Sequence, residues 1–181
     1  YKRQALYTAD GASHNTAVGK SSLYASTTGN NNTAVGRNAA ASITTGNYNT
    51  AIGAYALDAQ TTQDSNTAVG YIALGKNTTG YRNVALGKSA GQENTTGSSN
   101  SFLGFDAGGN STGDHNTLVG KSAGVGIGAG VRNTIVGSVA NDSGNGNDNT
   151  AVGYAWLTGM SNGANSNTCL GASAGYSVTT G

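Results

Sequence analysis

The sequence predicts an all-β protein, a parallel β-solenoid (β-roll) of about ten rungs of 17 residues each. Two observations favour this fold class. The pentapeptide Asn-Thr-Ala-Val-Gly returns along the whole chain, and the 181 residues include 30 glycines and no proline, with 9% charged residues. Apolar residues at fixed spacing argue against a disordered polar chain. The lack of proline suits a sheet in which each backbone N–H donates to a neighbouring strand.

The repeat is almost constant in length, with 16 to 18 residues between successive opening asparagines. Such uniformity is typical of stacked rungs, and we interpret residues 1–181 as a single repeat array and as an excerpt of a longer fibre. Below, column n denotes residue n of every rung, counted from the opening asparagine as column one. The rungs open at Asn15, Asn32, Asn49, Asn66, Asn83, Asn100, Asn116, Asn133, Asn149 and Asn167.

Three columns define the expected rung. Column five is glycine in all ten rungs, which indicates a turn with positive φ or a close approach of two backbones. Column four is always aliphatic, so we expect it to stack into the core of a coil that has two short strands per rung. Turns that contain glycine leave no run long enough for a stable helix. The asparagines of column one are expected to hydrogen-bond to one another up the stack.

Column three is apolar in every rung. Neighbouring residues of a strand point to opposite faces, so if column four faces the interior, column three faces outward and forms an association stripe covered by another copy of the chain. The alternative is a monomer in which both columns line a flattened interior. The stripe comprises Ala17, Ala34, Ala51, Ala68, Ala85, Phe102, Leu118, Ile135, Ala151 and Cys169. Cys169 is the single cysteine and fits the stripe as a small apolar residue.

The motif Asn-Thr-Ala-Val-Gly-(Xaa)2-Ala-Leu followed by Thr-Thr-Gly, complete at Asn66 to Gly80, resembles the repeats of phage tail-fibre proteins and related bacterial surface proteins. It is also similar to the shorter repeat in head domains of trimeric autotransporter adhesins. That resemblance implies a left-handed β-roll with three chains side by side. The rung here is longer than the adhesin repeat, and column three changes from alanine to Phe102, Leu118 and Ile135 in three consecutive rungs.

The acidic residues are dispersed, whereas hydrolysis of polysaccharides commonly needs two carboxyl groups about 5 to 9.5 Å apart. Asp58 and Asp142 share a column but lie five rungs apart, roughly 24 Å. Within one rung, Asp58 and Asp64 or Asp142 and Asp148 either meet across a loop or are separately solvated turn residues. We expect no enzymatic activity, no catalytic residue and no cofactor.

Metal binding is not predicted either. His14 and His115 each precede an opening asparagine and lie six rungs apart, so one chain cannot bring them together. Either histidine meets its own copies around the axis of a three-fold assembly, or it is solvated. The run from Asn141 to Asn149 is rich in oxygen ligands, which permits a weak cation site but also describes a turn.

Four aromatic residues are candidates for contact with carbohydrate, because exposed aromatic rings stack on sugars, although they also fit as packing residues. Tyr71, Phe105 and Tyr154 occupy column six, and Trp156 interrupts an alanine column. The predicted function is a structural segment of an extracellular, cell-surface or virion fibre that binds a host or cell surface through glycan. The alternative functions are the body of a self-assembling extracellular filament and an ice-binding solenoid with a threonine column.

The expected partners are further copies of the chain, as a homotrimer or polymer, and cell-surface carbohydrate. A formal net charge of +1 provides no broad basic face for nucleic acid. The sequence contains no hydrophobic run of about 18 residues, so no membrane span is predicted.

Overall fold

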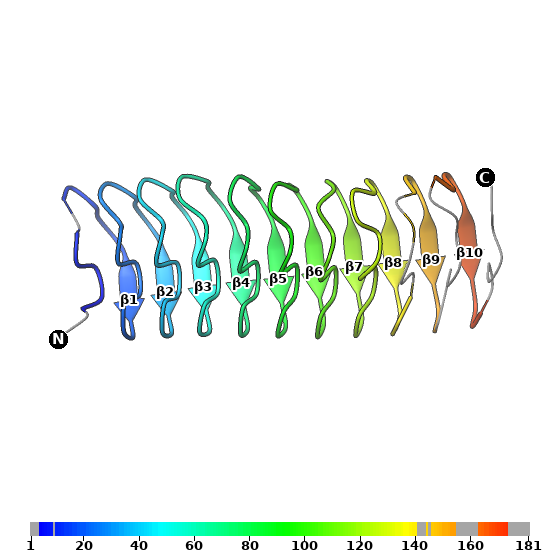
Figure 1. Cartoon of the computed structure of the whole chain (residues 1–181), viewed down its shortest axis with the longest axis horizontal. Coiled ribbons are helices and arrows are strands. Elements are labelled where there is room, and N and C mark those ends of the chain that lie inside the picture. Colours follow the sequence, from blue (N-terminus) through cyan, green and yellow to red (C-terminus); the bar gives the residue numbers. More distant parts are fainter. Residues whose placement is uncertain (1–3, 9, 141–143, 145, 155–162, 174–181) are drawn as a thin grey trace.

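The computed structural model describes residues 4–8, 10–140, 144, 146–154 and 163–173, and it confirms the all-β parallel solenoid. Figure 1 shows a rod in which ten short strands lie side by side, each crossing the long axis. All ten belong to one sheet, in the order in which they occur in the chain, and each pairs in parallel with the next. The strands pair column by column, as in Thr67 opposite Val84 and Ala68 opposite Ala85.

Each strand covers columns two to four of one rung. The strands are β1 Thr16–Val18, β2 Thr33–Val35, β3 Thr50–Ile52, β4 Thr67–Val69, β5 Val84–Leu86, β6 Ser101–Leu103, β7 Thr117–Val119, β8 Thr134–Val136, β9 Thr150–Val152 and β10 Thr168–Leu170.

The prediction of two strands per rung is wrong, because the described part of each rung contains one strand followed by turns. The reason lies in the backbone of columns seven and nine, where positive φ recurs even at residues other than glycine, as in Tyr55 (φ 60) and Leu57 (φ 50). A strand cannot hold alternating left-handed residues. The turns still bond from rung to rung, as in the N–H of Leu57 that donates to the carbonyl of Ala73 at 3.1 Å.

Column five confirms the predicted need for glycine. Its ten glycines have φ between 113° and 149°. A Cβ atom on Gly36 would lie 2.6 Å from the carbonyl oxygen of Gly53, so the turns of successive rungs are too close for any side chain.

The orientation predicted for columns three and four is reversed in the structure. Column three faces the interior. Ala34, Ala51, Ala68, Ala85, Phe102, Leu118, Ile135 and Ala151 are 0% exposed, and the partly buried Ala17 and Cys169 of the terminal strands pack against the same core. Column four faces outward instead. The prediction that column three is an association stripe is therefore wrong. The physical reason is the width of the interior. The strand faces the alanines of column eight, and the space between them is so narrow that the inward-facing residue of the strand is usually alanine.

The interior is filled by matching large residues with small ones. Three rungs with alanine in column three, those of Ala17, Ala51 and Ala68, carry a buried leucine in column nine, which is Leu23, Leu57 and Leu74 respectively. Where column three is Phe102, the adjacent column nine residues are Gly91 and Gly108. A Cβ atom on Gly91 would lie 2.5 Å from Cδ2 of Phe102, so the ring occupies the space that leucine fills in earlier rungs.

The asparagines of column one form the predicted ladder. The backbone N–H of Asn83 donates to Oδ1 of Asn66 at 2.9 Å, and its own Nδ2 donates to the carbonyl of Gly97 at 2.8 Å. The eight column one asparagines from Asn32 to Asn149 are at most 1% exposed, so the ladder satisfies backbone groups that water does not reach.

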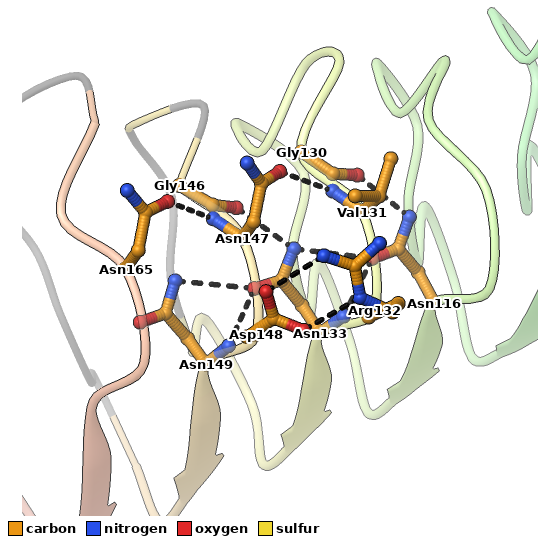
Figure 2. Close-up of polar contacts among 10 residues, drawn as sticks. All are labelled: Asn116, Gly130, Val131, Arg132, Asn133, Gly146, Asn147, Asp148, Asn149 and Asn165. Atoms are coloured by element: carbon orange, nitrogen blue, oxygen red, sulfur yellow. Dashed lines mark hydrogen bonds and ion pairs between the residues drawn. The ribbon is translucent and has the colours of Figure 1, made fainter.

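A second ladder, not predicted from the sequence, follows the residues two places before each opening asparagine. In it the N–H of the earlier rung donates to the later side chain, as from Val131 to Oδ1 of Asn147 at 2.9 Å. In the column one ladder the later rung donates. Figure 2 shows the two rows side by side, with Asn165 and Asn147 above and Asn149, Asn133 and Asn116 below. The two ladders therefore run in opposite directions.

Candidate functional site

The outward side of the sheet presents two parallel rows of side chains, columns two and four, which we call the sheet face. Column two is threonine in eight of the ten rungs, and column four is valine, isoleucine or leucine in all. The aliphatic row is half-buried to exposed, with Leu86 at 50% and Val18 at 57% exposure. None of the strand residues on this face is charged. An uncovered aliphatic row of this length is unusual on a monomer.

Charged side chains stand beside the sheet face. Column six, next to the glycine turn, carries Lys20, Arg37, Lys88 and Lys121, all of which are exposed. At the other margin Arg132 forms a two-armed ion pair with Asp148, from Nε at 2.6 Å and from Nη2 at 2.7 Å. Hydrogen bonds from Arg132 lower the pKa of Asp148.

A cavity of about 350 Å³ opens on the turn side of the β3 and β4 rungs. Its lining includes Arg37, Tyr55, Asp58, Tyr71, Ile72 and Lys76. The space arises where two columns carry small residues: Ala54 lies between Arg37 and Tyr71 in column six, and Gly75 follows Asp58 in column ten. Every other described residue of column six between Lys20 and Lys121 is a cation or an aromatic residue.

The cavity has two aromatic walls and opposite charges. The rings of Tyr55 and Tyr71 meet edge to face, with centroids 6.2 Å apart and planes at 88°. The guanidinium of Arg37 lies 4.8 Å from the centroid of the Tyr55 ring. Partial burial raises the pKa of Asp58. Nζ of Lys76 pairs with Oε1 of Glu93 at 2.8 Å, so much of its charge is already neutralised.

The predicted aromatic candidates are not brought together into one site. Tyr71 lines the cavity, and Phe105 is 47% exposed, with Nζ of Lys88 5.5 Å from its ring centroid. Tyr154 is exposed three rungs beyond Phe105, roughly 14 Å away. Trp156 lies outside the described residues. Sequence reasoning missed Tyr55, although it is the one aromatic residue of column seven among the described rungs.

The acidic residues within the described ranges have separate roles. Asp64 belongs to the second ladder, where its Oδ1 accepts the N–H of Asn47 at 2.6 Å, and Asp58 lines the cavity. Asp142 lies outside the described residues. In the run from Asn141 to Asn149, Oδ1 of Asn147 accepts the N–H of Val131 (Figure 2), and Oδ1 of Asn149 accepts the N–H of Asn167. These oxygens already hold the solenoid together.

His14 and His115 are both exposed, each with positive φ immediately before an opening asparagine. In the part of the chain that the structure describes, no three His, Cys, Asp or Glu residues gather into a group that could hold a metal ion.

Within the same described ranges, the structure contains no helix with the length and hydrophobicity needed to cross a membrane. Comparisons with protein-family models, with curated proteins and with solved structures found no match to this chain.

Proposed function

We propose that this chain is a structural segment of an extracellular or virion-surface fibre that assembles with copies of itself and contacts a host or cell surface through carbohydrate. The observation that supports the proposal is the sheet face. It presents an aliphatic row along all ten strands, and no strand residue on it is charged. Covering that row would bury apolar surface that a single thin coil leaves in water.

A second copy is the occupant that fits this face best. The strands repeat at about 4.8 Å, so the side chains form evenly spaced ridges. Only a surface with the same spacing keeps its contacts in phase over the whole length, and another copy of the chain has that spacing. Because columns two and four carry no charge, two such faces approach without burying an ion. A homotrimer and a polymer both satisfy this requirement.

In this proposal, the turns make the contact with the host or cell surface. The described turns carry exposed tyrosines, among them Tyr48 and Tyr71, which are the residue type that stacks on sugar rings. A rod with an assembly face on one side and aromatic turns elsewhere suits a fibre that holds its binding groups away from a particle or cell.

The association is tested by placing a carboxylate in the aliphatic row. Leu86→Asp and Ile52→Asp are each expected to reduce the mass of the assembly measured by light scattering after size-exclusion chromatography, because a charge buried at the interface costs several kcal/mol and recurs in every copy. Thr96→Asp, on an exposed turn of the β5 rung, is the matched control and should keep the parent mass. A monomeric parent, or variants that keep the parent mass, would contradict the proposal. An assembly whose mass keeps increasing with protein concentration would favour the body of a filament over a discrete fibre.

Ice binding is a second candidate function, and one observation favours it. The threonines of column two point outward beside the aliphatic row, in register along a continuous parallel sheet, which gives a regular array of hydroxyl and methyl groups. Val84 and Ser101 interrupt the threonine row.

If the sheet face binds ice, the parent protein lowers the freezing point below the melting point, and Thr67→Lys abolishes that difference because its long charged side chain disrupts the array. Thr96→Lys, on the exposed turn, is the control and should leave the difference intact. A parent without thermal hysteresis removes this candidate.

A further inference from the structure

We propose that the cavity formed by the β3 and β4 rungs, between Tyr55, Tyr71, Asp58 and Arg37, binds one neutral hexopyranose unit of a carbohydrate chain. This inference rests on the surface-contact part of the proposed function and names the class of ligand and its site. It does not depend on the sheet face.

The aromatic walls suit a pyranose. A pyranose ring presents C–H groups on one face and hydroxyls around its edge. The perpendicular rings of Tyr55 and Tyr71 form a corner, so one ring can stack under the C–H face while the other packs against its edge. Tyr71 is 47% exposed, which leaves its ring accessible from solvent.

The polar groups of the cavity complement hydroxyls. A carboxylate only accepts hydrogen bonds, and its two oxygens can each accept one from a pair of neighbouring hydroxyls, as Asp58 would here. Arg37 only donates, so it would serve the lone pairs of the same hydroxyls. A sugar hydroxyl both donates and accepts, and so it is the ligand group that satisfies Asp58 and Arg37 together.

The charge balance favours a neutral sugar over an acidic one. Arg37 and Asp58 carry opposite charges, and Lys76 is paired with Glu93. The four charges sum to zero. A carboxylated sugar would therefore add net negative charge to a balanced site and would be repelled by Asp58.

The walls are already in position before a ligand binds. Tyr55 and Ile72 sit in turns with positive φ, and their N–H groups donate to the carbonyls of Arg37 and Ala54 at 2.9 and 3.0 Å. The backbone that carries the aromatic corner is thus fixed by the rung-to-rung bonds. A volume of about 350 Å³ lies at the lower end of the range for small-molecule sites, about 300 to 1,000 Å³, which accommodates one sugar ring.

The test uses saturation-transfer NMR on the full chain, with the methyl pyranosides of glucose, galactose and mannose as neutral probes and methyl glucuronide as the acidic probe. We expect at least one neutral probe to receive saturation on its ring C–H protons. Tyr71→Ala should weaken its binding at least tenfold through loss of the stacking surface. Asp58→Asn should weaken it about tenfold, as expected for loss of a hydrogen bond to a charged group.

Two controls separate binding from folding. Tyr81→Ala removes an equally exposed tyrosine outside the cavity and should leave binding unchanged. Tyr71→Phe keeps the ring and should retain most of the affinity. All variants should keep the parent circular dichroism spectrum and melting temperature.

The inference is overturned if no neutral probe binds, if only the glucuronide binds, or if Tyr71→Ala binds a neutral probe as well as the parent. Measuring the mass of the same samples distinguishes this failure from failure of the fibre proposal, because the cavity variants lie off the sheet face and should not change the assembly.

Discussion

Asn83→Ala is expected to lower the free energy of unfolding by roughly 2 to 6 kcal/mol. The side chain is fully buried and serves two backbone groups, accepting the N–H of Asn100 at 2.9 Å and donating to the carbonyl of Gly97 at 2.8 Å. Alanine leaves both groups unpaired in the interior, and each buried polar group without a partner costs about 1 to 3 kcal/mol. Urea denaturation gives the total, and hydrogen exchange at the Asn100 amide reports the local opening.

The exposed Asn110 offers a matched control for this substitution, and Asn110→Ala should change stability by less than about 0.5 kcal/mol. A stability loss of the same small size in Asn83→Ala would show that the ladder is not needed to satisfy the interior.

The variant Asn83→Asp adds a dependence on pH. The new carboxylate keeps the acceptor for Asn100 but faces the carbonyl of Gly97, where the amide donated before. Burial and that repulsion raise its folded-state pKa above the unfolded value of about 3.9. The folded state then binds more protons, so the variant is most stable below about pH 4 and loses stability as the pH rises through the folded pKa.

The second large effect is expected in the core. Phe102→Ala should cost about 3 to 5 kcal/mol, because Phe102 is fully buried and its removal leaves a cavity. Gly91→Leu alone should also destabilise the protein, since even its Cβ atom would lie 2.5 Å from Cδ2 of Phe102.

The two substitutions together should recover much of what each loses. Phe102→Ala with Gly91→Leu recreates the arrangement one rung earlier, where Leu74 of column nine is followed in the next rung by Ala85 of column three. The positive φ of Gly91, 59°, is close to the 48° of Leu74, so the backbone already accepts leucine. We expect a favourable coupling energy of about 2 kcal/mol or more in a double-mutant cycle of urea denaturation midpoints. Simple addition of the two single effects would mean that the columns do not share one space.

The repeat made much of the fold predictable. Constant spacing of the asparagines and the glycine of column five led directly to stacked parallel rungs and the ladder, because both depend on period alone. The direction of the strand faces was mispredicted, because alternation separates columns three and four without saying which is inside. Size could have decided it. Phe102 and Leu118 coincide with glycine in column nine, whereas column four varies among Val, Ile and Leu without such compensation.

The candidate site was harder to reach from the sequence. Tyr71 was identified as an exposed aromatic of column six, but the cavity beside it depends on which turn columns become neighbours. Arg37, Tyr55 and Asp58 are 18 and 3 residues apart in sequence and meet because the turns fold columns six, seven and ten together. Turn geometry with positive φ at residues other than glycine gives little sequence signal.

The direction of the hydrogen bonds has a mechanical consequence. Figure 1 shows the strands lying across the long axis, so the bonds between rungs run along it. Tension applied at the two ends would load the contacts between rungs in series, and the weakest contact would open first. A rung that detaches would extend from about 4.8 Å, its share of the length of the rod, to roughly 58 Å, the span of 17 extended residues. Each rung is therefore a reserve of length that would absorb a sudden pull before the chain is fully extended.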